Sequence, residues 1–475
     1  MTRKAKAISY AVGALVGLLA LVAAGLFLFL DIDAYKPRIE AAISETFGME
    51  VKVDGRLGIS LFPGVLVSLE DVHIRNRGAE IATAREARIG VGLLALLRKG
   101  IEIKHIALEH LSISIERDGD GRFNFERPEQ AGGPLPKLNL AQLTFSDGTL
   151  YYLDKRSGLE FEADACSLNP GRLQLEEGAR AAMMKNLSLA AELTCGEVRT
   201  TSHTVSDVKF SLAGQRGIFD LKPLTLRAFA GQGSGSIRAD FTGAVPRYDV
   251  HVSLAQLHIG EFLKTLSPPV PAEGTMDFAM TLSLQGKSVN ELRQSMAGQF
   301  SLRGENLILN GRDLDRQFAR YESSQNFNLV DVGALFFVGP VGLAVTKGFN
   351  FASIFQESEG RSEIRTVVSE WKVERGVAHS RDVAMATNEN RVALQGELDF
   401  VNQQFDHMTV ALIDARGCIR AQQEIHGDFN EPVLEKPSTL KTLTGPVVTL
   451  LEKLGSLFPD GECEVFYAGS VAAPE

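Results

Sequence analysis

The sequence has few of the residues on which common binding and catalytic sites are built. It contains 4 cysteines among 475 residues, none in a Cys-x-x-Cys pair, so a disulfide-scaffold mini-protein and a structural zinc site are not expected. Lysine and arginine number 49 against 59 aspartates and glutamates. This net charge of −10, without a long basic run, argues against nucleic acid as a partner. Hydrophobic residues nevertheless make up 44%, which indicates an ordered chain.

The longest apolar run lies near the start of the chain. A short basic tail, residues 1–7, precedes a charge-free stretch of 23 residues, Ile8–Leu30. That length spans a bilayer core, so we expect a cytoplasmic tail at 1–7 and a transmembrane anchor at 8–30. A cleaved secretory signal is the alternative, but apolar residues continue well past the small residues at 23–25. Basic residues also follow the run, between Lys36 and Arg56, so charge alone does not decide the orientation.

After this run, the spacing of the apolar residues changes from the period of a helix to that of a strand. Apolar residues at helical spacing predict a helix over 31–47, which either lies on the bilayer surface or caps the adjoining sheet. After Gly48, apolar and polar residues alternate, with a phase slip near Asp71, and glycine, asparagine and aspartate punctuate the segments. About twenty or more strands are expected from this alternation. Long crossover helices are missing, which favours antiparallel pairing.

A few segments interrupt the strand pattern. Short helices are expected at 259–266, 289–296, 314–321 and 440–454, with a final strand at 463–468. The proline-rich stretch 268–271 is the best internal boundary. A second apolar tract, 333–355, is too short and too broken by Gly339-Pro340 to span a bilayer. It is a buried loop or helix, an element that touches the membrane or lipid, or a membrane span that this pattern fails to predict.

The four cysteines all follow the apolar run, as two within 166–195 and two within 418–463. If the body lies outside the cytoplasm, the pairs Cys166–Cys195 and Cys418–Cys463 are the simplest of three connectivities. Four buried free thiols are the alternative.

None of the candidate catalytic or metal-binding clusters is convincing. His105, Glu109 and His110 lie in a segment predicted to be a strand, where successive side chains alternate between the two faces. The acidic loop 118–126 lacks the spacing of an EF-hand and is typical of a hairpin turn. The glycine-rich stretch 231–235 lacks the lysine and the helix of a phosphate loop. We therefore expect no enzyme activity, no metal and no cofactor.

Several short blocks resemble proteins of the AsmA family. Each block is weak alone, but their order and spacing together are fairly specific, and they span most of the chain. They are Asp31–Glu40, Gly55–Pro63, Leu69–Asn76, Asp120–Phe125, Gly231–Phe241 and Leu282–Asp313, with Asn310–Leu314 inside a family-like glycine and aspartate motif.

The resemblance implies a single-pass protein of the bacterial inner membrane with its body in the periplasm. The family is similar to bridge-like lipid-transfer proteins, whose repeating sheets curl into a long apolar groove, and it is linked to outer-membrane assembly and phospholipid movement. The implied partners are phospholipid or another lipid, the inner membrane, and outer-membrane assembly proteins. With the proline-rich stretch as the boundary, the body divides into an AsmA-like β-groove region at 31–267 and an AsmA-like β region at 268–475 with a helical insert at 314–356.

The expected fold class is therefore mainly β: an N-terminal transmembrane helix followed by an elongated, curled antiparallel β-sheet groove with a few short helices. A long sheet with one apolar face needs a cover, and few helices are available, so either two sheets face each other or one sheet curls over a ligand. The leading function is binding of lipid acyl chains in support of phospholipid transport and outer-membrane assembly. The alternative is a non-catalytic envelope scaffold or regulator of outer-membrane protein assembly. The candidate groove residues are Val51, Val53, Ile101, Ile103, Leu111, Ile113 and Ile115.

Overall fold

The computed structural model describes most of the predicted β body. The described residues are 36–37, 40–41, 44, 49–60, 65–91, 103–126, 138–156, 158–176, 183–200, 203–264, 271–311, 313–324, 360–429, 431–435, 438–439 and 463–474. In these ranges no helix has both the length and the apolar character needed to cross a membrane. The predicted anchor at 8–30, the tract at 333–355 and the helix at 440–454 lie outside them. The chain divides into two compact units, unit 1 with residues 1–133 and 139–160, and unit 2 with residues 134–138 and 161–475.

Unit 1 is built from alternating strands that follow the two-residue period. Its strands are β1 (Glu50–Val53), β2 (Leu57–Ser60), β3 (Val65–Asn76), β4 (Ala79–Val91), β5 (Ile103–Arg117) and β6 (Leu138–Asp154). The short strands β1 and β2 pair with opposite halves of β3, and β3, β4 and β5 pair antiparallel in order. A cluster of valine, leucine and alanine side chains is buried on one face.

The phase slip near Asp71 is a distortion of strand β3. Asp71 adopts a positive φ of 51°, and the apolar residues on either side, Leu69 and Val72, both pack into the same buried cluster. An extra residue of this kind is a β-bulge, and aspartate tolerates the left-handed conformation better than most residues. The bulge keeps the apolar side chains on one face although their spacing changes.

One pair of strands departs from the expected antiparallel order. β5 and β6 pair in parallel, with Ile106 opposite Leu143 and Ile113 opposite Leu150. A parallel pair needs a connection long enough to return the chain to the same end of the sheet. Residues 118–137 provide such a connection, so the expectation of a purely antiparallel sheet was wrong at this point.

The edge strand β1 is covered by side chains from the segment predicted to be helical at 31–47. Lys36, Pro37, Glu40, Ala41 and Ser44 have helical conformation. The Val53 backbone N–H donates to Glu40 Oε1 at 2.8 Å, and the Val51 N–H donates to Ser44 Oγ at 2.9 Å. Unpaired edge groups invite pairing with other chains, so these bonds protect the edge. Of the two interpretations of this segment, the contacts support the one in which it caps the sheet.

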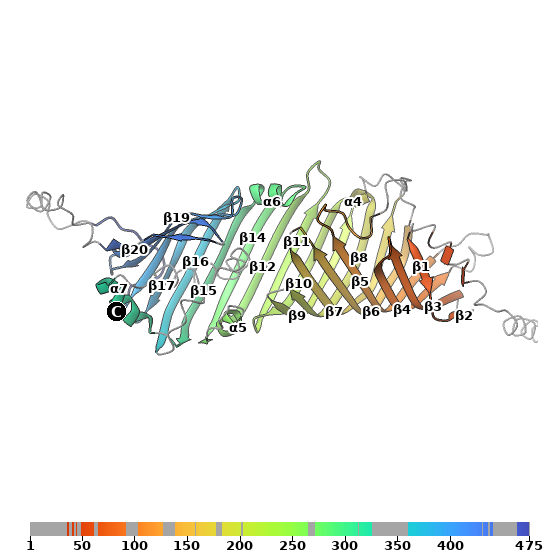
Figure 1. Ribbon diagram of the computed structural model, residues 1–475, viewed down its shortest axis with the longest axis horizontal. Coiled ribbons are helices and arrows are strands. Elements are labelled where there is room, and N and C mark those ends of the chain that lie inside the picture. The colour runs from red at the N-terminus through yellow and green to blue at the C-terminus, as the bar shows by residue number, and fades with distance from the viewer. Residues whose placement is uncertain are drawn as a thin grey trace, which may run out of the picture. The chain divides into compact units, whose positions relative to one another are not determined.

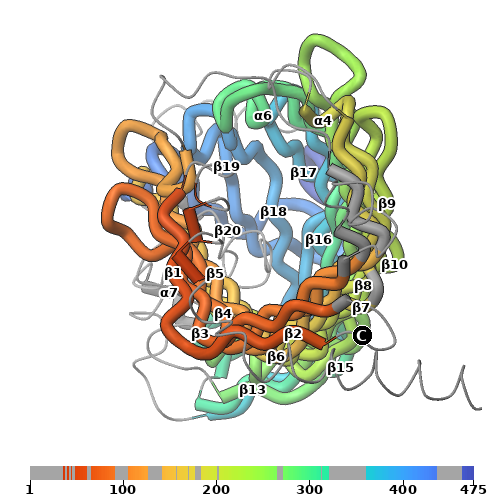
Figure 2. Tube along the Cα trace, turned by 90° about the vertical axis from the view of Figure 1, so that its right-hand side faces the viewer, coloured from red at the N-terminus to blue at the C-terminus, as the bar shows by residue number. Residues whose placement is uncertain are grey.

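Unit 2 contains the longer series of strands (Figure 1). They are β7 (Leu159–Leu175), β8 (Leu187–Thr200), β9 (Thr204–Gln215), β10 (Ile218–Ala228), β11 (Gly231–Asp240), β12 (Arg247–His258), β13 (Ala272–Glu273), β14 (Thr275–Gln285), β15 (Ala297–Asn310), β16 (Arg361–Glu374), β17 (Val377–Thr387), β18 (Arg391–Asp399), β19 (Gln404–Ile413), β20 (Ile419–Asp428), β21 (Val433–Leu434) and β22 (Ser438–Thr439). The long strands from β7 to β20 pair antiparallel with their neighbours, and β15 to β19 follow one another around an arc (Figure 2).

Four short helices lie at the ends of these strands: α4 (Met183–Asn186), α5 (Ile259–Leu263), α6 (Val289–Ser295) and α7 (Leu314–Ser324). The last three confirm helices expected from the sequence, and α5 and α6 lie at opposite ends of the strands (Figure 1). The proposed boundary at 268–271 falls between β12 and β14, which pair directly with each other.

The main core of unit 2 lies on one face of the sheet. Its largest fully buried side chains include Trp371 on β16, Phe318 on α7 and Phe429 after β20. Ile259, Phe262 and Leu263 of α5 belong to the same cluster. The two helices therefore seal the apolar face locally, at one end of the strands.

The opposite face is covered by the C-terminal segment Cys463–Pro474, which we call the strap. Both predicted cysteine pairs are disulfides, Cys166–Cys195 and Cys418–Cys463, and the second one fixes the start of the strap. The Tyr467 hydroxyl donates to Asp382, the Ser470 N–H donates to Asp382 at 3.0 Å, and Arg391 donates to the Val471 carbonyl at 2.9 Å.

The strap residues form a small second core but not the strand expected at 463–468. Their one β-type pairing within the described residues is an isolated bridge between Cys418 and Val465. Tyr467 and Val471 pack on an alanine-rich patch of β17, β18 and β19. Burial alone would raise the pKa of Asp382, but the hydrogen bonds from Ser470 and Tyr467 outweigh it and hold the pKa below its usual value.

Replacement of Phe318 by alanine tests the sealed core. Phe318 is fully buried, so the truncation leaves a cavity and we expect a loss of about 3–5 kcal/mol in the free energy of unfolding. The emission of Trp371, the single tryptophan, reports the transition during urea denaturation. The matched control is Val289→Ala on α6, where the side chain is exposed and a change within about 0.5 kcal/mol is expected. Equal losses in both variants would contradict the described core.

The strap can be tested by removal of its disulfide. The double change Cys418→Ser and Cys463→Ser opens a loop of 45 residues, which chain-entropy arguments value at about 4 kcal/mol. We expect faster amide hydrogen exchange at Tyr467 and Val471. The double change Cys166→Ser and Cys195→Ser serves as the control and should leave exchange in the strap unchanged. Unaltered protection of the strap in the first variant would show that the disulfide does not hold it.

Candidate functional site

The candidate site is a band of apolar side chains that crosses six neighbouring strands of unit 2. Strand pairing places one residue from each of β8, β9, β10, β11, β12 and β14 directly opposite the next. We call these residues the first row: Ala191, Leu212, Leu221, Ile237, Val250 and Leu282. All six are half-buried, which means that part of each remains accessible to solvent.

A second row lies two to three residues further along the same strands. Its members are Leu193, Phe210, Leu224, Gly235, Val252 and Met280, and they also are half-buried. Single exposed apolar residues are ordinary, but a contiguous apolar surface on a folded protein marks a binding site. The two rows form such a surface, which has no polar side chain among its members.

The helix α5 and a set of aromatic rings bound this surface at the end of the strands opposite to α6. Phe262 of α5 packs edge-to-face on Phe229 at a centroid distance of 5.4 Å, and Phe229 packs in the same way on His203. Beyond the second row, Leu254 and Phe278 are buried in the main core. The apolar face is thus accessible over one half of each strand and sealed over the other half.

On strand β11, glycine residues leave part of the apolar face without side chains. The positions of β11 that share the apolar face begin with Gly231, Gly233 and Gly235, because they alternate with polar residues. A Cβ atom at Gly233 would lie 2.5 Å from Leu226 Cδ1 and 3.0 Å from Leu254 Cδ2. The leucines of the neighbouring strands therefore lean over the β11 backbone, and a larger residue at Gly233 would push them outward.

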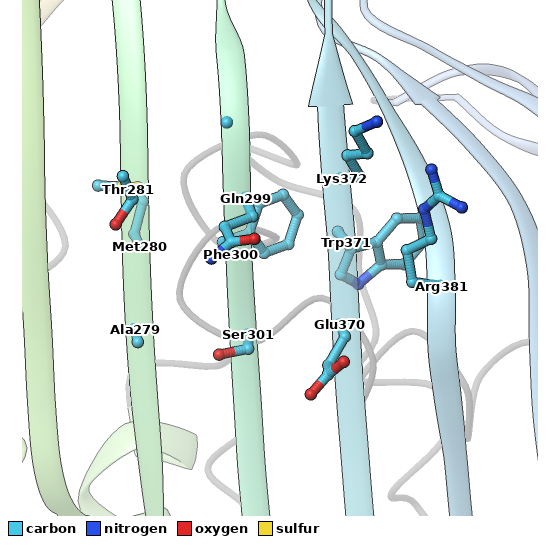
Figure 3. Close-up of a pocket in the computed structure, with 11 residues that line it drawn as sticks. Ala279, Met280, Thr281, Gln299, Phe300, Ser301, Glu370, Trp371, Lys372 and Arg381 are labelled. Atoms are coloured by element: carbon cyan, nitrogen blue, oxygen red, sulfur yellow. The ribbon is translucent and has the colours of Figure 1, made fainter. Parts of the chain in front are cut away.

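The accessible face ends at β15. The second row continues from Met280 to Phe300 on β15 and Trp371 on β16, but these two side chains are only 4% and 2% exposed. Their rings stack at 5.9 Å with an angle of 17°. Figure 3 shows Met280, Phe300 and Trp371 on successive strands. The apolar face becomes a filled core from this point to β20.

The reverse face of the same strands is polar. Thr194, Lys209, Thr225, Ser234 and Ser253 follow one another from β8 to β12 in directly paired positions. The Ser234 and Ser253 hydroxyls are 2.8 Å apart. A pocket of about 450 Å³ over β14 to β17 is lined mostly by residues of this polar face (Figure 3). The two faces therefore differ sharply in chemistry.

The groove residues expected from the sequence fall in unit 1. Val51 and Val53 are buried in one cluster, and Leu111 packs against it. Ile113 and Ile115 are half-buried on β5, Ile103 begins that strand, and Ile101 lies outside the described residues. The sequence-based selection stopped at Ile115 and missed the rows of unit 2. The same alternation continues there and would have identified them.

The other candidate clusters are engaged in local structure. Glu109 pairs with Arg88 at 2.9 Å and His110 with Asp147 at 3.2 Å. Asp118 accepts the Arg122 N–H at 2.8 Å, and this backbone hydrogen bond lowers the pKa of the Asp118 carboxyl. Residues 231–235 form the first half of β11. Among the residues that the structure describes, no three or more His, Cys, Asp or Glu side chains gather as a metal site would require.

These features define a class of protein in which one face of a long, mainly antiparallel sheet is apolar and partly accessible. The model of the AsmA family matches residues 1–163 and 135–338, so the chain belongs to the AsmA family. Comparison with curated proteins and with solved structures gives no significant match.

The histidine at the α5 end of the surface gives a pH-dependent prediction. Burial lowers the pKa of His203, so folding favours its neutral form. The unfolded chain takes up a proton near pH 6.5. The contribution of His203 to stability is therefore complete above that pH and is lost as the pH falls through the lower folded-state pKa. We expect the urea midpoint to decrease with falling pH less steeply in His203→Phe than in the unchanged protein.

The measurement is urea denaturation at several pH values from about 7.5 downward, followed by Trp371 emission. His251→Phe, which replaces an exposed histidine on the polar face, is the matched control for the loss of an imidazole. Parallel pH profiles for His203→Phe and the unchanged protein would contradict burial of a neutral His203.

Proposed function

We propose that this protein binds lipid acyl chains on the half-buried apolar rows and so supports phospholipid transport and outer-membrane assembly. One observation carries the proposal: the two rows form an apolar surface across six strands that the described helices leave partly accessible. Membership of the AsmA family supports an envelope-related role. An acyl chain gains about 0.8 kcal/mol for each methylene that leaves water, so such a surface needs no polar contact to hold one.

The proposed location follows the family resemblance and the N-terminal sequence. We propose a single-pass anchor at 8–30 in the bacterial inner membrane and a body in the periplasm. The two disulfides support this location, because structural disulfides persist in oxidising compartments. The proposed partners are phospholipid or another lipid, the inner membrane and outer-membrane assembly proteins.

We also propose that the protein is not an enzyme. Binding and movement of an apolar chain require a continuous surface rather than a nucleophile or a general base. The clusters that the sequence suggested as reactive are each explained by neighbouring ion pairs or turns.

A second candidate function is a non-catalytic scaffold or regulator of outer-membrane protein assembly. The observation that favours it is the filled core from β15 to β20, where Val410, Leu412 and Ala421 are fully buried. A face filled by its own side chains has no room for an acyl chain. This part of the chain, with its strap, is suited to binding other proteins through its polar surface.

Mass spectrometry of organic extracts tests the lipid proposal. The fragment 31–475, exported to the periplasm and purified without detergent, should carry stoichiometric phospholipid. Val250→Asp places a carboxylate in the first row and should reduce the bound lipid severalfold, because a charge in contact with acyl chains is strongly unfavourable. His251→Asp is the matched control on the polar face and should leave the lipid content unchanged.

The outcomes separate the two candidate functions. A stably folded fragment without lipid would overturn the lipid proposal and favour the scaffold. An equal loss of lipid in both variants would show that the two faces of the sheet do not differ as proposed.

A further inference from the structure

The connections at the α6 end of the strands form one continuous surface beside the apolar rows. They are residues 183–186, 215–218, 240–247 and 286–296, and we call them the rim. The Phe241 N–H donates to the Gly217 carbonyl at 2.7 Å, and the Gly286 N–H donates to the Pro246 carbonyl at 3.0 Å. Lys185 lies beside Gly217, where an added Cβ would be 3.5 Å from its Cγ. Neighbouring connections of the rim are therefore in contact.

The rim is basic in an acidic protein. It carries five basic residues, Lys185, Arg216, Lys287, Arg247 and Arg293, against two acidic ones, Asp240 and Glu291. None of the five basic side chains forms an ion pair with a residue that the structure describes. Four of them, Lys185, Arg216, Lys287 and Arg293, are thus available to an external anion.

Both acidic residues of the rim are used within their own connections. The Asp240 carboxylate accepts hydrogen bonds from the Thr242 hydroxyl at 2.6 Å and from its N–H at 2.8 Å, and these bonds lower its pKa. The Glu291 carboxylate accepts the Lys287 N–H at 2.8 Å. Asp240 also lies directly opposite Arg247 in the strand pairing, and the charge of Arg247 contributes to the lowered pKa of Asp240.

The opposite end of the same strands has a different charge balance. The described connections there, residues 228–231, 258–264 and 271–275, contain Glu261, Glu273, His258 and a single lysine or arginine, Lys264. Lys264 pairs with Glu261 at 2.6 Å. Among the described connections of these strands, only those at the α6 end thus carry lysine or arginine side chains without an ion pair.

Aromatic rings lie between the basic rim and the first row. Phe219 packs edge-to-face on Phe241 at 5.7 Å, and Phe241 packs in the same way on Tyr248 at 5.9 Å. Burial raises the pKa of Tyr248, in accordance with its place on the apolar face. From the connections of the rim inward, the order is basic, then aromatic at Tyr248, then apolar at Val250 and Val252, whereas Arg247 itself alternates onto the polar face with Asp249 and His251.

This order matches the polarity of a phospholipid from phosphate to acyl chain. Membrane interfaces show the same sequence of basic residues, aromatic belt and apolar interior. From Tyr248 to the buried Leu254 the strand covers about 20 Å at roughly 3.4 Å per residue. One leaflet of a bilayer core is about 15 Å thick. The accessible half of the strands is therefore long enough for one acyl chain that lies along them.

We propose that the rim is an anion site for the phosphate of a glycerophospholipid whose acyl chains lie on the two rows and point toward α5. This proposal rests on the proposed function and adds the headgroup site and the orientation of the lipid. The phosphate contacts are supplied by Lys185, Arg216 and Lys287.

Site-specific photo-crosslinking in the full-length chain tests the orientation. A photoreactive amino acid is placed at Ala244 in the rim, at Val252 in the second row, or at His251 on the polar face as the control. Cells are grown with [³²P]phosphate, irradiated and lysed, and the protein is purified under denaturing conditions. Phospholipase C then cleaves the bond between glycerol and phosphate. An adduct made through an acyl chain loses its label, whereas an adduct made through the headgroup keeps it.

We expect a label at Val252 that phospholipase C removes, a label at Ala244 that it does not remove, and no label at His251. No label at Val252 would overturn the proposed function itself. A label at Val252 with none at Ala244, or with a removable label at Ala244, would overturn only the headgroup site and leave lipid binding in place.

Charge reversal in the rim provides a second test. The triple variant Lys185→Glu, Arg216→Glu and Lys287→Glu should reduce the labelled adduct at Val252 about fivefold or more. The matched control changes Lys209, Arg227 and Arg238 to glutamate on the polar face of β9, β10 and β11, with the same change in net charge. An equal reduction in both triple variants would show a general effect of charge and would overturn the rim site. Trp371 emission confirms that each variant is folded.

Discussion

The constraint on which the rest of the structure depends is the two-residue period of the strands. Because successive side chains point to opposite faces, the alternating sequence places nearly all apolar groups of a strand on one face. Antiparallel pairing then joins these groups across neighbouring strands into continuous rows. A sheet of this kind must bury its apolar face against something.

Unit 2 meets this requirement in two different ways. From β15 to β20 the sheet is filled by its own large side chains, among them Trp371 and Phe429, and α7 adds Phe318. From β8 to β14, α5 seals only one end of the strands, and the other end stays half-buried. The same pattern of residues therefore produces a stable core in one region and an accessible apolar surface in the next. Stability and binding use the same physical force, the removal of apolar surface from water.

The polar groups of the fold mark the boundaries of the apolar surfaces. Glu40 and Ser44 satisfy the N–H groups of the edge strand β1. Asp382 and Arg391 hold the strap over an alanine-rich patch that would otherwise face solvent. The basic rim lies at the end of the strands where the apolar face remains accessible. In each case, polar side chains lie where a strand edge or an apolar face of the sheet is not covered by another strand.

The sequence by itself determined the mainly β class, the helices α5, α6 and α7, and the cysteine pairs, since each rests on local spacing or on nearest-neighbour pairing. It also indicated the slip at Asp71, because a bulge changes the period locally. Only the tertiary structure decided that β5 and β6 run parallel, that Val465 makes an isolated bridge instead of a strand, and that Met280 is accessible while Phe300 is sealed. These features depend on contacts between distant residues. Met280 and Phe300 follow the same local pattern, but Phe300 stacks on Trp371 of the next strand, which no local pattern in the sequence predicts.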